Sequence, residues 1–472
     1  MKIVTPAQMK GMDQRTVEEG SFTSLQLMQN AAEALYEEIT RWMEQKGAEK
    51  ILLLAGLGNN GGDAYALACL LHPVYQPAIL PVGEGERSPD CEYYYQKCKE
   101  RGIPFVEDPA GYPLVAEGVF GTGFRGELPQ EVQALFEKIT VPVAAIDLPG
   151  GMNGVSGVAA KGTLKAELTV TFAYPKPCHL FADCGRVVVK DIGIPASYGA
   201  EITRAELRPQ LPKREAWGHK TRYGTVGLLV GASQYPGAAA LALTGALKSG
   251  AGLVIGYLPK EARRAAAAKF YGPVLQAPSE LFPLKWDAYL AGSGLGRSRA
   301  AGNQMKKLWR SDRPLVVDGD GLWHLQKFLC PRKGVTVLTP HMGEFARLLG
   351  CDPEELRQNR LNWAEEFAAR YGCVLVLKDA ATLVTDGKET AILSAPCSAL
   401  AKGGSGDLLA GLIAGILAGD SKKALEAAKL GVYLHNRAAH LACKTGSARA
   451  LQPEEIAGKI SDAWMELEHE AF

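Results

Sequence analysis

Several features are missing from this chain of 472 residues, and each absence excludes a class of protein. Its 10 cysteines include no Cys-x-x-Cys pair, which argues against a zinc site or a disulfide framework and favours reduced thiols. A net charge of +1, from 52 basic and 51 acidic residues, argues against a charge-driven partner. No apolar run approaches the roughly 20 residues that span a bilayer, and the N-terminus lacks the apolar core of a signal peptide. We therefore expect a cytoplasmic protein with no nucleic-acid or membrane partner.

The length predicts two domains, because a chain this long exceeds one ordinary hydrophobic core. Strand-like apolar runs alternate with helical periodicity, which is typical of α/β proteins with mostly parallel sheets. A segment rich in charge and proline, 204–218, separates the halves, so we predict domains 1–212 and 213–472. A helix over Ser24–Trp42 is predicted, with Ser24 as its cap. The predicted strands are Lys50–Ala55, Leu114–Phe120, Val141–Ile146, Leu168–Phe172, Arg186–Val189, Thr225–Val230, Leu253–Tyr257, Ala288–Ala291, Leu315–Val317, Val335–Leu338, Val374–Leu377 and a hairpin of Thr382–Asp386 with Glu389–Leu393.

The most informative stretch is Gly403-Gly404-Ser405-Gly406-Asp407, followed by the apolar run Leu408–Leu417. Glycines allow several backbone N–H groups to converge on one anion, and the apolar run predicts a helix whose positive end faces that anion. A carboxylate and a phosphate repel each other, so an aspartate beside a phosphate-binding loop indicates a chemical role for its carboxylate. Asp407 is therefore predicted to take a proton from a hydroxyl that attacks phosphorus.

The first half has its own glycine-rich loop, which runs from Gly56 to Asp63 between a predicted strand and a helix over Ala64–Leu71. A tight turn in any α/β protein would use the same glycines. The amides of Asn59 and Asn60 and the carboxylate of Asp63 favour a cation or ribose site instead. Asp147 follows a later strand and should emerge at the same sheet edge, either as a ligand contact or as a loop cap.

The order of these motifs resembles that of a known family. Asn59–Asp63, Gly121-Thr122-Gly123, Asp147-Leu148-Pro149 and Thr171–Pro177 are similar to the NAD(P)H-hydrate epimerase family. The second half resembles its usual fusion partner, the ADP-dependent NAD(P)H-hydrate dehydratases. The matching pieces there are His219–Gly224, Gly231–Ala239, Gly292–Gly296, Asp318–Leu322, Thr339–Glu344, Leu377–Thr382 and Gly403–Asp407.

The resemblance implies a Rossmann-like three-layer domain followed by a ribokinase-like α/β/α domain. The first would interconvert R and S hydrates of NADH and NADPH. The second would dehydrate the S hydrate, with ADP, or ATP as an alternative, as phosphoryl donor and release of AMP and phosphate. Mg²⁺ can accompany the nucleotide, a potassium ion is implied in the first domain, and homo-oligomers are typical of the family.

The resemblance also implies site residues. Catalytic roles fall to Asp407 and Asp147. Epimerase substrate contacts are implied for Asn59, Asn60, Gly61, Gly62, Asp63, Gly121, Thr122, Gly123, Phe124, Arg125, Gly126, Glu127 and Asp147. Dehydratase substrate contacts are implied for Gly294, Pro340, His341, Met342, Gly343, Glu344, Phe345, Ala346 and Asp407. ADP contacts are implied for Lys378, Asp379, Ala380, Ala381, Thr382, Cys397, Ser398, Ala399, Leu400, Ala401, Lys402, Gly403, Gly404, Ser405 and Gly406. Potassium ligands are implied at Asn60, Glu117 and Gly150, and Lys176 is assigned to substrate phosphates.

The chain departs from the family pattern at several of these positions. Glu117 stands where an aspartate is usual, Gly150 where a serine is usual, and Ala64 where a glycine is usual. The longer Glu117 is expected to crowd or displace the ion, which weakens the epimerase prediction more than the dehydratase prediction. Asp379 replaces a usual glycine near the expected ADP, where an inward-pointing negative charge would weaken nucleotide binding.

Alternatives remain for individual residues and for the whole chain. His341 would otherwise be an ordinary loop histidine, and Lys378 a solvated strand end. A loop of the Gly403–Asp407 type also serves small-molecule kinases. The alternative is therefore a ribokinase-like kinase with a non-catalytic, ligand-binding N-terminal domain.

Overall fold

A computed structural model describes residues 3–18, 20, 22–194, 200–211, 214–420 and 423–469, which form two compact units, Met1–Gly199 and Ala200–Phe472. The predicted boundary at residue 212 lies outside the described residues. The short strand β7 (Ala200–Glu201) pairs with a strand of the second unit, so the described segment 200–211 begins that unit.

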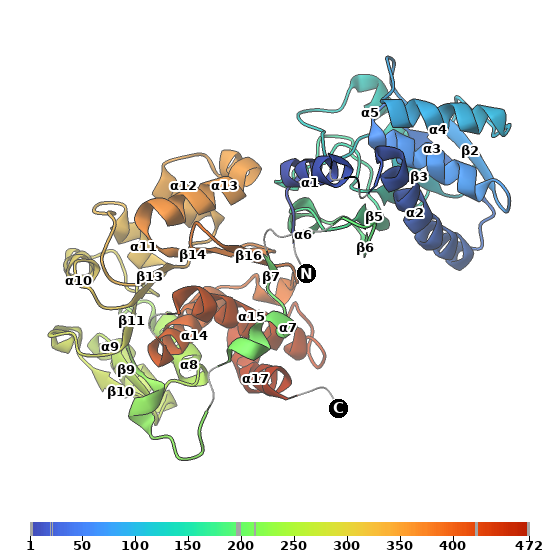
Figure 1. Cartoon of the computed structure of the whole chain (residues 1–472). Coiled ribbons are helices and arrows are strands. Elements are labelled where there is room, and N and C mark those ends of the chain that lie inside the picture. Colours follow the sequence, from blue (N-terminus) through green and yellow to red (C-terminus); the bar gives the residue numbers. More distant parts are fainter. Residues whose placement is uncertain are drawn as a thin grey trace. The chain divides into compact units, whose positions relative to one another are not determined.

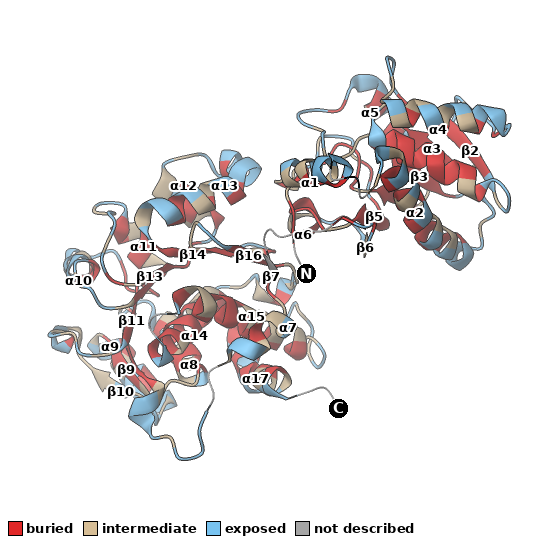
Figure 2. Cartoon of the chain, in the orientation of Figure 1, coloured by how far each residue is buried: buried red, intermediate tan, exposed pale blue. Residues whose placement is uncertain are grey.

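The first unit contains a six-stranded sheet in the order β2-β1-β3-β4-β5-β6, and all neighbouring strands run parallel (Figure 1). Its central strands are buried along almost their whole length because both faces are covered (Figure 2). The strands are β1 (Lys50–Ala55), β2 (Gln76–Pro81), β3 (Val115–Gly118), β4 (Val143–Ile146), β5 (Leu168–Phe172) and β6 (Arg186–Lys190).

Helices cover this sheet on both faces, which makes three layers. Successive residues of β1 point to opposite faces, so Leu53 packs with α2 and α3 while Leu52 packs with α5. The predicted Rossmann-like architecture is therefore confirmed. The helices are α1 (Pro6–Glu18), α2 (Ser24–Lys46), α3 (Asn59–Leu71), α4 (Pro89–Glu100), α5 (Gln130–Glu137) and α6 (Cys178–Phe181).

The second unit contains a ten-stranded sheet in the order β10-β9-β8-β11-β12-β13-β14-β15-β16-β7. Strands from β10 to β14 are parallel, and the β15–β16 hairpin adds two antiparallel strands. Those not yet given are β8 (Thr225–Leu229), β9 (Leu253–Tyr257), β10 (Val274–Gln276), β11 (Ala288–Ala291), β12 (Leu315–Val317), β13 (Thr336–Leu338), β14 (Val374–Leu377), β15 (Thr382–Thr385) and β16 (Thr390–Leu393).

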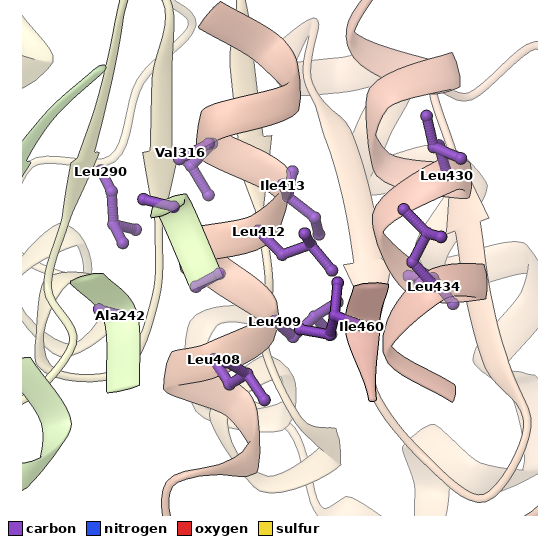
Figure 3. Close-up of a cluster of buried hydrophobic side chains, with 14 of the residues drawn as sticks. Ala242, Leu290, Val316, Leu408, Leu409, Leu412, Ile413, Leu430, Leu434 and Ile460 are labelled. Carbon is purple, nitrogen blue, oxygen red and sulfur yellow. The ribbon is translucent and has the colours of Figure 1, made fainter. Parts of the chain in front are cut away.

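The core of the second unit is centred on α14 (Ser405–Gly419), which packs against the sheet and lies between the helices α8 and α15 (Figure 3). α8 and α14 approach very closely, since a Cβ at Gly411 would lie 2.0 Å from the carbonyl oxygen of Ala242. Helices α10–α13 lie across the other face (Figure 1). The helices are α7 (Arg204–Leu207), α8 (Pro236–Lys248), α9 (Lys260–Lys269), α10 (Arg299–Trp309), α11 (Asp320–Leu325), α12 (Met342–Leu349), α13 (Pro353–Tyr371), α15 (Ala424–Ala442), α16 (Pro453–Gly458) and α17 (Ile460–Glu468).

Every predicted strand is present, with ends that shift by up to a few residues. Strands β2, β7 and β10 escaped prediction; β2 contains two prolines, which are tolerated because it lies at the sheet edge. The predicted cap of α2 was wrong, since the Thr23 side chain accepts the N–H of Gln26 in a capping box. Within the described ranges, no helix is both long and apolar enough to cross a bilayer.

Candidate active sites

The first candidate site lies at the carboxyl edge of the six-stranded sheet. α3 begins at Asn59, so the stretch up to Asp63, which we expected to be loop, forms the first turns of a helix. The turn before it is tight, because a Cβ at Gly61 would lie 2.0 Å from the carbonyl oxygen of Gly56. The positive N-terminal end of α3 therefore faces this edge of the sheet.

Asp147 and Lys176 form a buried ion pair at the same edge. The Lys176 ammonium group donates to Asp147 Oδ1 at 2.6 Å and to Thr171 Oγ1 at 2.8 Å, and only 1% of Lys176 is exposed. Thr171 also donates to Asp147 Oδ1, at 2.8 Å. Sequence analysis assigned Lys176 to substrate phosphates, but the structure directs its ammonium group to Asp147.

His179 holds the backbone of this pair in place. Its Nδ1 accepts the N–H of Lys176 at 3.0 Å, so the ring proton sits on Nε2, which donates to the carbonyl oxygen of Asp147 at 2.8 Å. Burial lowers the pKa of His179 to about 4, which keeps the ring neutral. The positive φ of Asp147, 63°, is unusual for a residue with a side chain, and this contact helps to maintain it.

A cavity of about 610 Å³ opens over the ion pair. The predicted residues that line it are Asn59, Asn60, Asp63, Gly121, Thr122 and Asp147. Gly61 and Gly62 are instead buried in the start of α3, and Gly123, Arg125, Gly126 and Glu127 lie on an exposed loop. Phe124 packs against Phe120 with ring centroids 5.0 Å apart. The loop 123–127 therefore lies outside this cavity lining in the described structure.

Three of the carboxyl groups that line the cavity, those of Asp13, Asp63 and Asp147, interact electrostatically with the Lys176 ammonium group. Burial favours a raised pKa for Asp147, but the charge and hydrogen bond of Lys176 hold its pKa below the ordinary value. Burial raises the pKa of Asp13, on α1, to about 6, and raises that of Asp63 well above its ordinary value. The cavity thus combines an ionised carboxylate with two that hold protons more readily.

The implied potassium ligands depend on each other. Glu117 is fully buried, and its two carboxylate oxygens accept the N–H groups of Val119 and Gly150, each at 2.7 Å. A Cβ at Gly150 would lie 2.4 Å from Glu117 Oε1. The longer acid therefore fills the space that a serine side chain would need, and the two departures from the family pattern compensate each other.

The oxygen atoms in this region are compatible with a monovalent cation. The Asn60 side chain donates through its nitrogen to the carbonyl oxygen of Phe120 at 3.0 Å, which leaves its own oxygen for a ligand. Burial raises the pKa of Glu117 to about 7 although backbone N–H groups favour the charged form. A cation beside this carboxylate would offset the cost of burying it.

The second candidate site lies at the N-terminus of α14. The helix begins at Ser405, earlier than the predicted Leu408, with Gly404 as its cap at a φ of 94°. Asp407 therefore lies in the first turn, beside the free backbone N–H groups that can bind an anion. A Cβ at Gly406 would lie 3.0 Å from the Lys378 ammonium group, so this lysine reaches the loop as predicted for a phosphate contact.

Asp318, at the end of β12, ties this site together. Its Oδ1 accepts hydrogen bonds from the Lys378 ammonium group and from Thr339 Oγ1, both at 2.8 Å, and its Oδ2 accepts from Ser293 Oγ at 3.2 Å. Burial, followed by the negative charge of Asp318, raises the pKa of Asp407 to about 7, although Lys378 acts in the opposite direction. Asp407 can therefore exchange a proton near neutral pH.

The stretch Pro340–Ala346 mixes site and core residues. The backbone N–H of Lys378 donates to the carbonyl oxygen of Pro340 at 2.8 Å, which brings this stretch to the second site. His341 is exposed and caps α12, since its Nδ1 accepts the N–H of Gly343 at 3.1 Å. Met342, Phe345 and Ala346 are buried, so the structure places their side chains in the core rather than toward a substrate. Gly294, at a φ of 58°, directly follows Ser293.

The predicted nucleotide segments flank the Gly403–Gly406 loop. Lys402 anchors the segment that begins at Cys397, because its ammonium group donates to the carbonyl oxygens of Arg449 at 2.8 Å and Leu451 at 2.5 Å. Ser398–Leu400 form a single 3₁₀ turn in which Ala399 is buried. Cys397, Leu400 and Ala401 flank or complete that turn, and Ala380, Ala381 and Thr382 lead into β15.

The unusual Asp379 is neutralised by a partner that the sequence did not suggest. Its Oδ2 accepts a hydrogen bond from Arg360 Nη1 at 3.0 Å, and its Oδ1 accepts the N–H of Ala380 at 2.9 Å. Only 6% of Arg360 is exposed. The negative charge of Asp379 is thus paired with Arg360 of α13, which reduces the expected repulsion between Asp379 and a nucleotide.

Sequence reasoning missed Asp13, Asp318, Ser293, His179 and His435 as site residues. The last of these lies behind the loop, with Nε2 3.2 Å from Ser405 Oγ, and burial lowers its pKa to about 4. Asp318 carried a usable signal, since it follows a parallel strand as Asp147 does. Ser293 carried the same signal, since it follows β11 within the Gly292–Gly296 motif, whereas Asp13, His179 and His435 gave none.

Comparison with known proteins finds matches to both units. A family model described as NAD(P)H-hydrate dehydratase matches residues 226–462, and one described as YjeF-related protein N-terminus matches residues 24–178. The bifunctional NAD(P)H-hydrate repair enzyme Nnr of Moorella thermoacetica is 33% identical, over 100% of this chain and 98% of the relative. The protein of the same name from Coxiella burnetii is 31% identical, over 95% of this chain and 96% of the relative.

Solved structures resemble the second unit. The ADP/ATP-dependent NAD(P)H-hydrate dehydratase of Bacillus subtilis, co-crystallised with ATP and Mg²⁺, gives a TM-score of 0.54 at 30% identity. It covers 58% of this chain and 100% of that protein. A ribokinase-like superfamily protein from Enterococcus faecalis gives a TM-score of 0.53 at 24% identity, covering 58% of this chain and 98% of its own. These structures confirm the predicted ribokinase-like fold.

The contact between Glu117 and Gly150 predicts non-additive mutations. Gly150→Ser alone should lower the free energy of unfolding by about 1–3 kcal/mol, because the new side chain overlaps the Glu117 carboxylate. Glu117→Asp together with Gly150→Ser should recover most of that loss, since the shorter acid vacates the space. Thermal or denaturant unfolding of the single and double variants would measure the coupling. Strictly additive effects would contradict the compensation.

Proposed function

Because the chain belongs to the family of bifunctional NAD(P)H-hydrate repair enzymes, we propose that its two units divide one repair between them. The substrates are reduced nicotinamide cofactors whose ring has gained water, in R and S forms. The N-terminal unit interconverts the two epimers. The C-terminal unit dehydrates the S hydrate at the expense of ADP and releases AMP and phosphate.

A single observation carries the dehydratase assignment: Asp407 lies at the N-terminus of α14 with a pKa raised to about 7. We propose that it takes the proton of the ring hydroxyl as the oxygen attacks the terminal phosphoryl group of ADP. The N–H groups at the start of α14 stabilise the charge on the phosphoryl oxygens. Phosphate then leaves as the ring nitrogen supplies its electron pair to form a C=N bond. Loss of a proton from the neighbouring ring carbon returns that pair to the nitrogen and restores the dihydropyridine.

Lys378 and Asp318 prepare this site for the nucleotide. The Lys378 ammonium group lies beside Gly406, where it can neutralise phosphate charge, and Asp318 holds it in position. The proposed ADP contacts are Lys378–Thr382 and Cys397–Gly406. The proposed hydrate contacts are Gly294, Pro340, His341, Gly343 and Glu344. Among the described residues, no group of three or more His, Cys, Asp or Glu side chains could hold a metal ion. Mg²⁺ would therefore be held mainly by the nucleotide phosphates.

The N-terminal unit is proposed to bind the hydrate in the cavity over Asp147. Epimerisation requires the hydroxyl-bearing carbon to lose and regain its configuration, and the ionised Asp147 can accept a proton in that exchange. Potassium is proposed beside Asn60, Glu117 and the backbone of Gly150, where it would balance the buried carboxylate and so stabilise the cavity wall. We further expect a cytoplasmic homo-oligomer.

Replacement of Asp407 by Asn should preserve the loop and reduce dehydratase turnover by about 10²- to 10⁴-fold, the usual contribution of a general base. In the unchanged enzyme, kcat/KM should fall as the pH drops below about 7, because the base must be ionised. Recovery of NADH absorbance from S hydrate and ADP would measure both effects. A stable phosphorylated alcohol without recovered NADH would instead support the kinase alternative.

Replacement of Asp147 by Asn should abolish epimerisation and leave dehydration intact, since the two reactions belong to different units. The variant should consume R hydrate with ADP only at the spontaneous epimerisation rate, and S hydrate at the normal rate. Rapid use of R hydrate would show that Asp147 is not required. Equal, slow use of R hydrate by the unchanged enzyme would favour a non-catalytic N-terminal unit.

Exchange of potassium for a bulky organic cation should slow epimerisation and spare dehydration, because the proposed ion lies in the first unit only. The ratio of R to S hydrate over time, measured without ADP, isolates epimerisation from dehydration. Glu117→Gln should weaken the dependence on potassium, since it removes the buried charge. An epimerisation rate independent of the cation would rule out a required potassium site.

A further inference from the structure

The N-terminal helix α1 forms one wall of the cavity over Asp147. The N–H of Val4, just before the helix, donates to the carbonyl oxygen of Pro175 at 3.0 Å. Pro6 packs over Gly154, where a Cβ would lie 2.7 Å from the Pro6 ring. The helix is thus fixed to the segment that carries Lys176 and to the loop that follows Asp147, and its Asp13 lines the cavity.

Asp13 faces charged groups from several elements. Lys176 lowers its pKa and Asp147 raises it, while burial, the largest influence, brings it to about 6. Asp13 in turn helps to raise the pKa of Asp63 on α3. Lys10 and Glu18 of the same helix and Asp90 of α4 also line the cavity. Asp13 therefore belongs to the same electrostatic group as the Asp147–Lys176 pair.

Epimerisation by loss and return of water needs two proton transfers on opposite faces of the ring. On one face the bond from carbon to hydroxyl breaks, the oxygen keeps the electron pair, and an acid supplies a proton so that water leaves. The ring nitrogen donates its electron pair to the carbon as a C=N bond. On the other face water adds, the electron pair of that bond returns to nitrogen, and a base takes the proton released. One carboxylate cannot serve both faces at once.

We propose that Asp13 is the second catalytic residue of the epimerase, which protonates the departing hydroxyl while Asp147 accepts a proton from the incoming water. This inference rests on the epimerase function proposed above. It follows from two observations: Asp13 and Asp147 line the same cavity from different elements, and the helix that carries Asp13 is anchored to the Asp147 and Lys176 segments. In the described structure Lys176 and Thr171 both donate to Asp147 Oδ1, so Oδ2 is the oxygen that Asp147 offers to the cavity.

Asp63 is the competing residue for this role. It lies in α3 with only 9% of its surface exposed, whereas Asp13 is half-buried on the cavity wall. Burial, with the negative charges of Asp147 and Asp13, raises the pKa of Asp63 well above its ordinary value, so Asp63 favours the protonated form. Asp13 combines access to the cavity with a pKa of about 6, which is close to neutral pH.

The test measures interconversion of purified R and S hydrates by the full chain without ADP, so that dehydration cannot proceed. Asp13→Asn should lower kcat by about 10²-fold or more with little change in KM. In the unchanged enzyme kcat/KM should fall as the pH rises above about 6, because the acid must be protonated, and Asp13→Asn should remove that dependence. Asp13→Glu should restore part of the rate and keep a pH dependence. Glu100→Gln, an exposed carboxylate of α4, should behave as the unchanged enzyme.

Several results would overturn the proposal. A rate for Asp13→Asn close to that of the unchanged enzyme would do so, as would a rise in KM alone. If only Asp63→Asn loses both the activity and the fall of kcat/KM at higher pH, Asp63 is the acid. If thermal unfolding shows that Asp13→Asn does not fold, the test depends on Asp13→Glu. A pH profile of kcat/KM that is unshifted in Asp13→Glu would reject Asp13. An unchanged enzyme that epimerises no faster than water alone would instead refute the proposed function.

Discussion

A lysine paired with an aspartate organises each of the two sites. Lys176 pairs with Asp147 at 2.6 Å in the first unit, and Lys378 pairs with Asp318 at 2.8 Å in the second. Both aspartates follow a parallel strand, where the carboxyl edge of the sheet concentrates polar groups. Burial of two charges is costly, and removal of one partner would leave the other unpaired. The charges of each pair therefore influence the pKa of the neighbouring carboxyl groups.

The two pairs leave different carboxyl groups available for chemistry. In the second unit Asp318 is occupied by Lys378, Thr339 and Ser293, and its charge makes Asp407 easier to protonate. In the first unit Asp147 is the paired carboxylate that faces the cavity, and its charge helps to raise the pKa of Asp13. A permanent ion pair beside an adjustable carboxyl group is thus common to both units, although their folds and reactions differ.

The sequence predicted the features that are local in the chain. Continuous apolar runs identify buried parallel strands, and the glycine turn after β1 identifies the sheet edge where Asp147 lies. A glycine loop before an apolar helix identifies the site of Asp407. The sequence did not predict contacts between segments that are distant in the chain. Asp13 reaches the cavity only because α1 docks on residues near 154 and 175, and Arg360 reaches Asp379 only through the packing of α13. Neither pairing has a spacing that a sequence could reveal.

The departures from the family pattern show why single positions mislead. Glu117 and Gly150 are each unfavourable for the first site when considered alone, yet the glycine provides the room that the longer acid occupies. Asp379 is unfavourable near a nucleotide until Arg360 is placed beside it. In both cases the effect of one residue depends on the volume and charge of the residues that it contacts. A site can therefore keep its function while the residues that build it change in pairs.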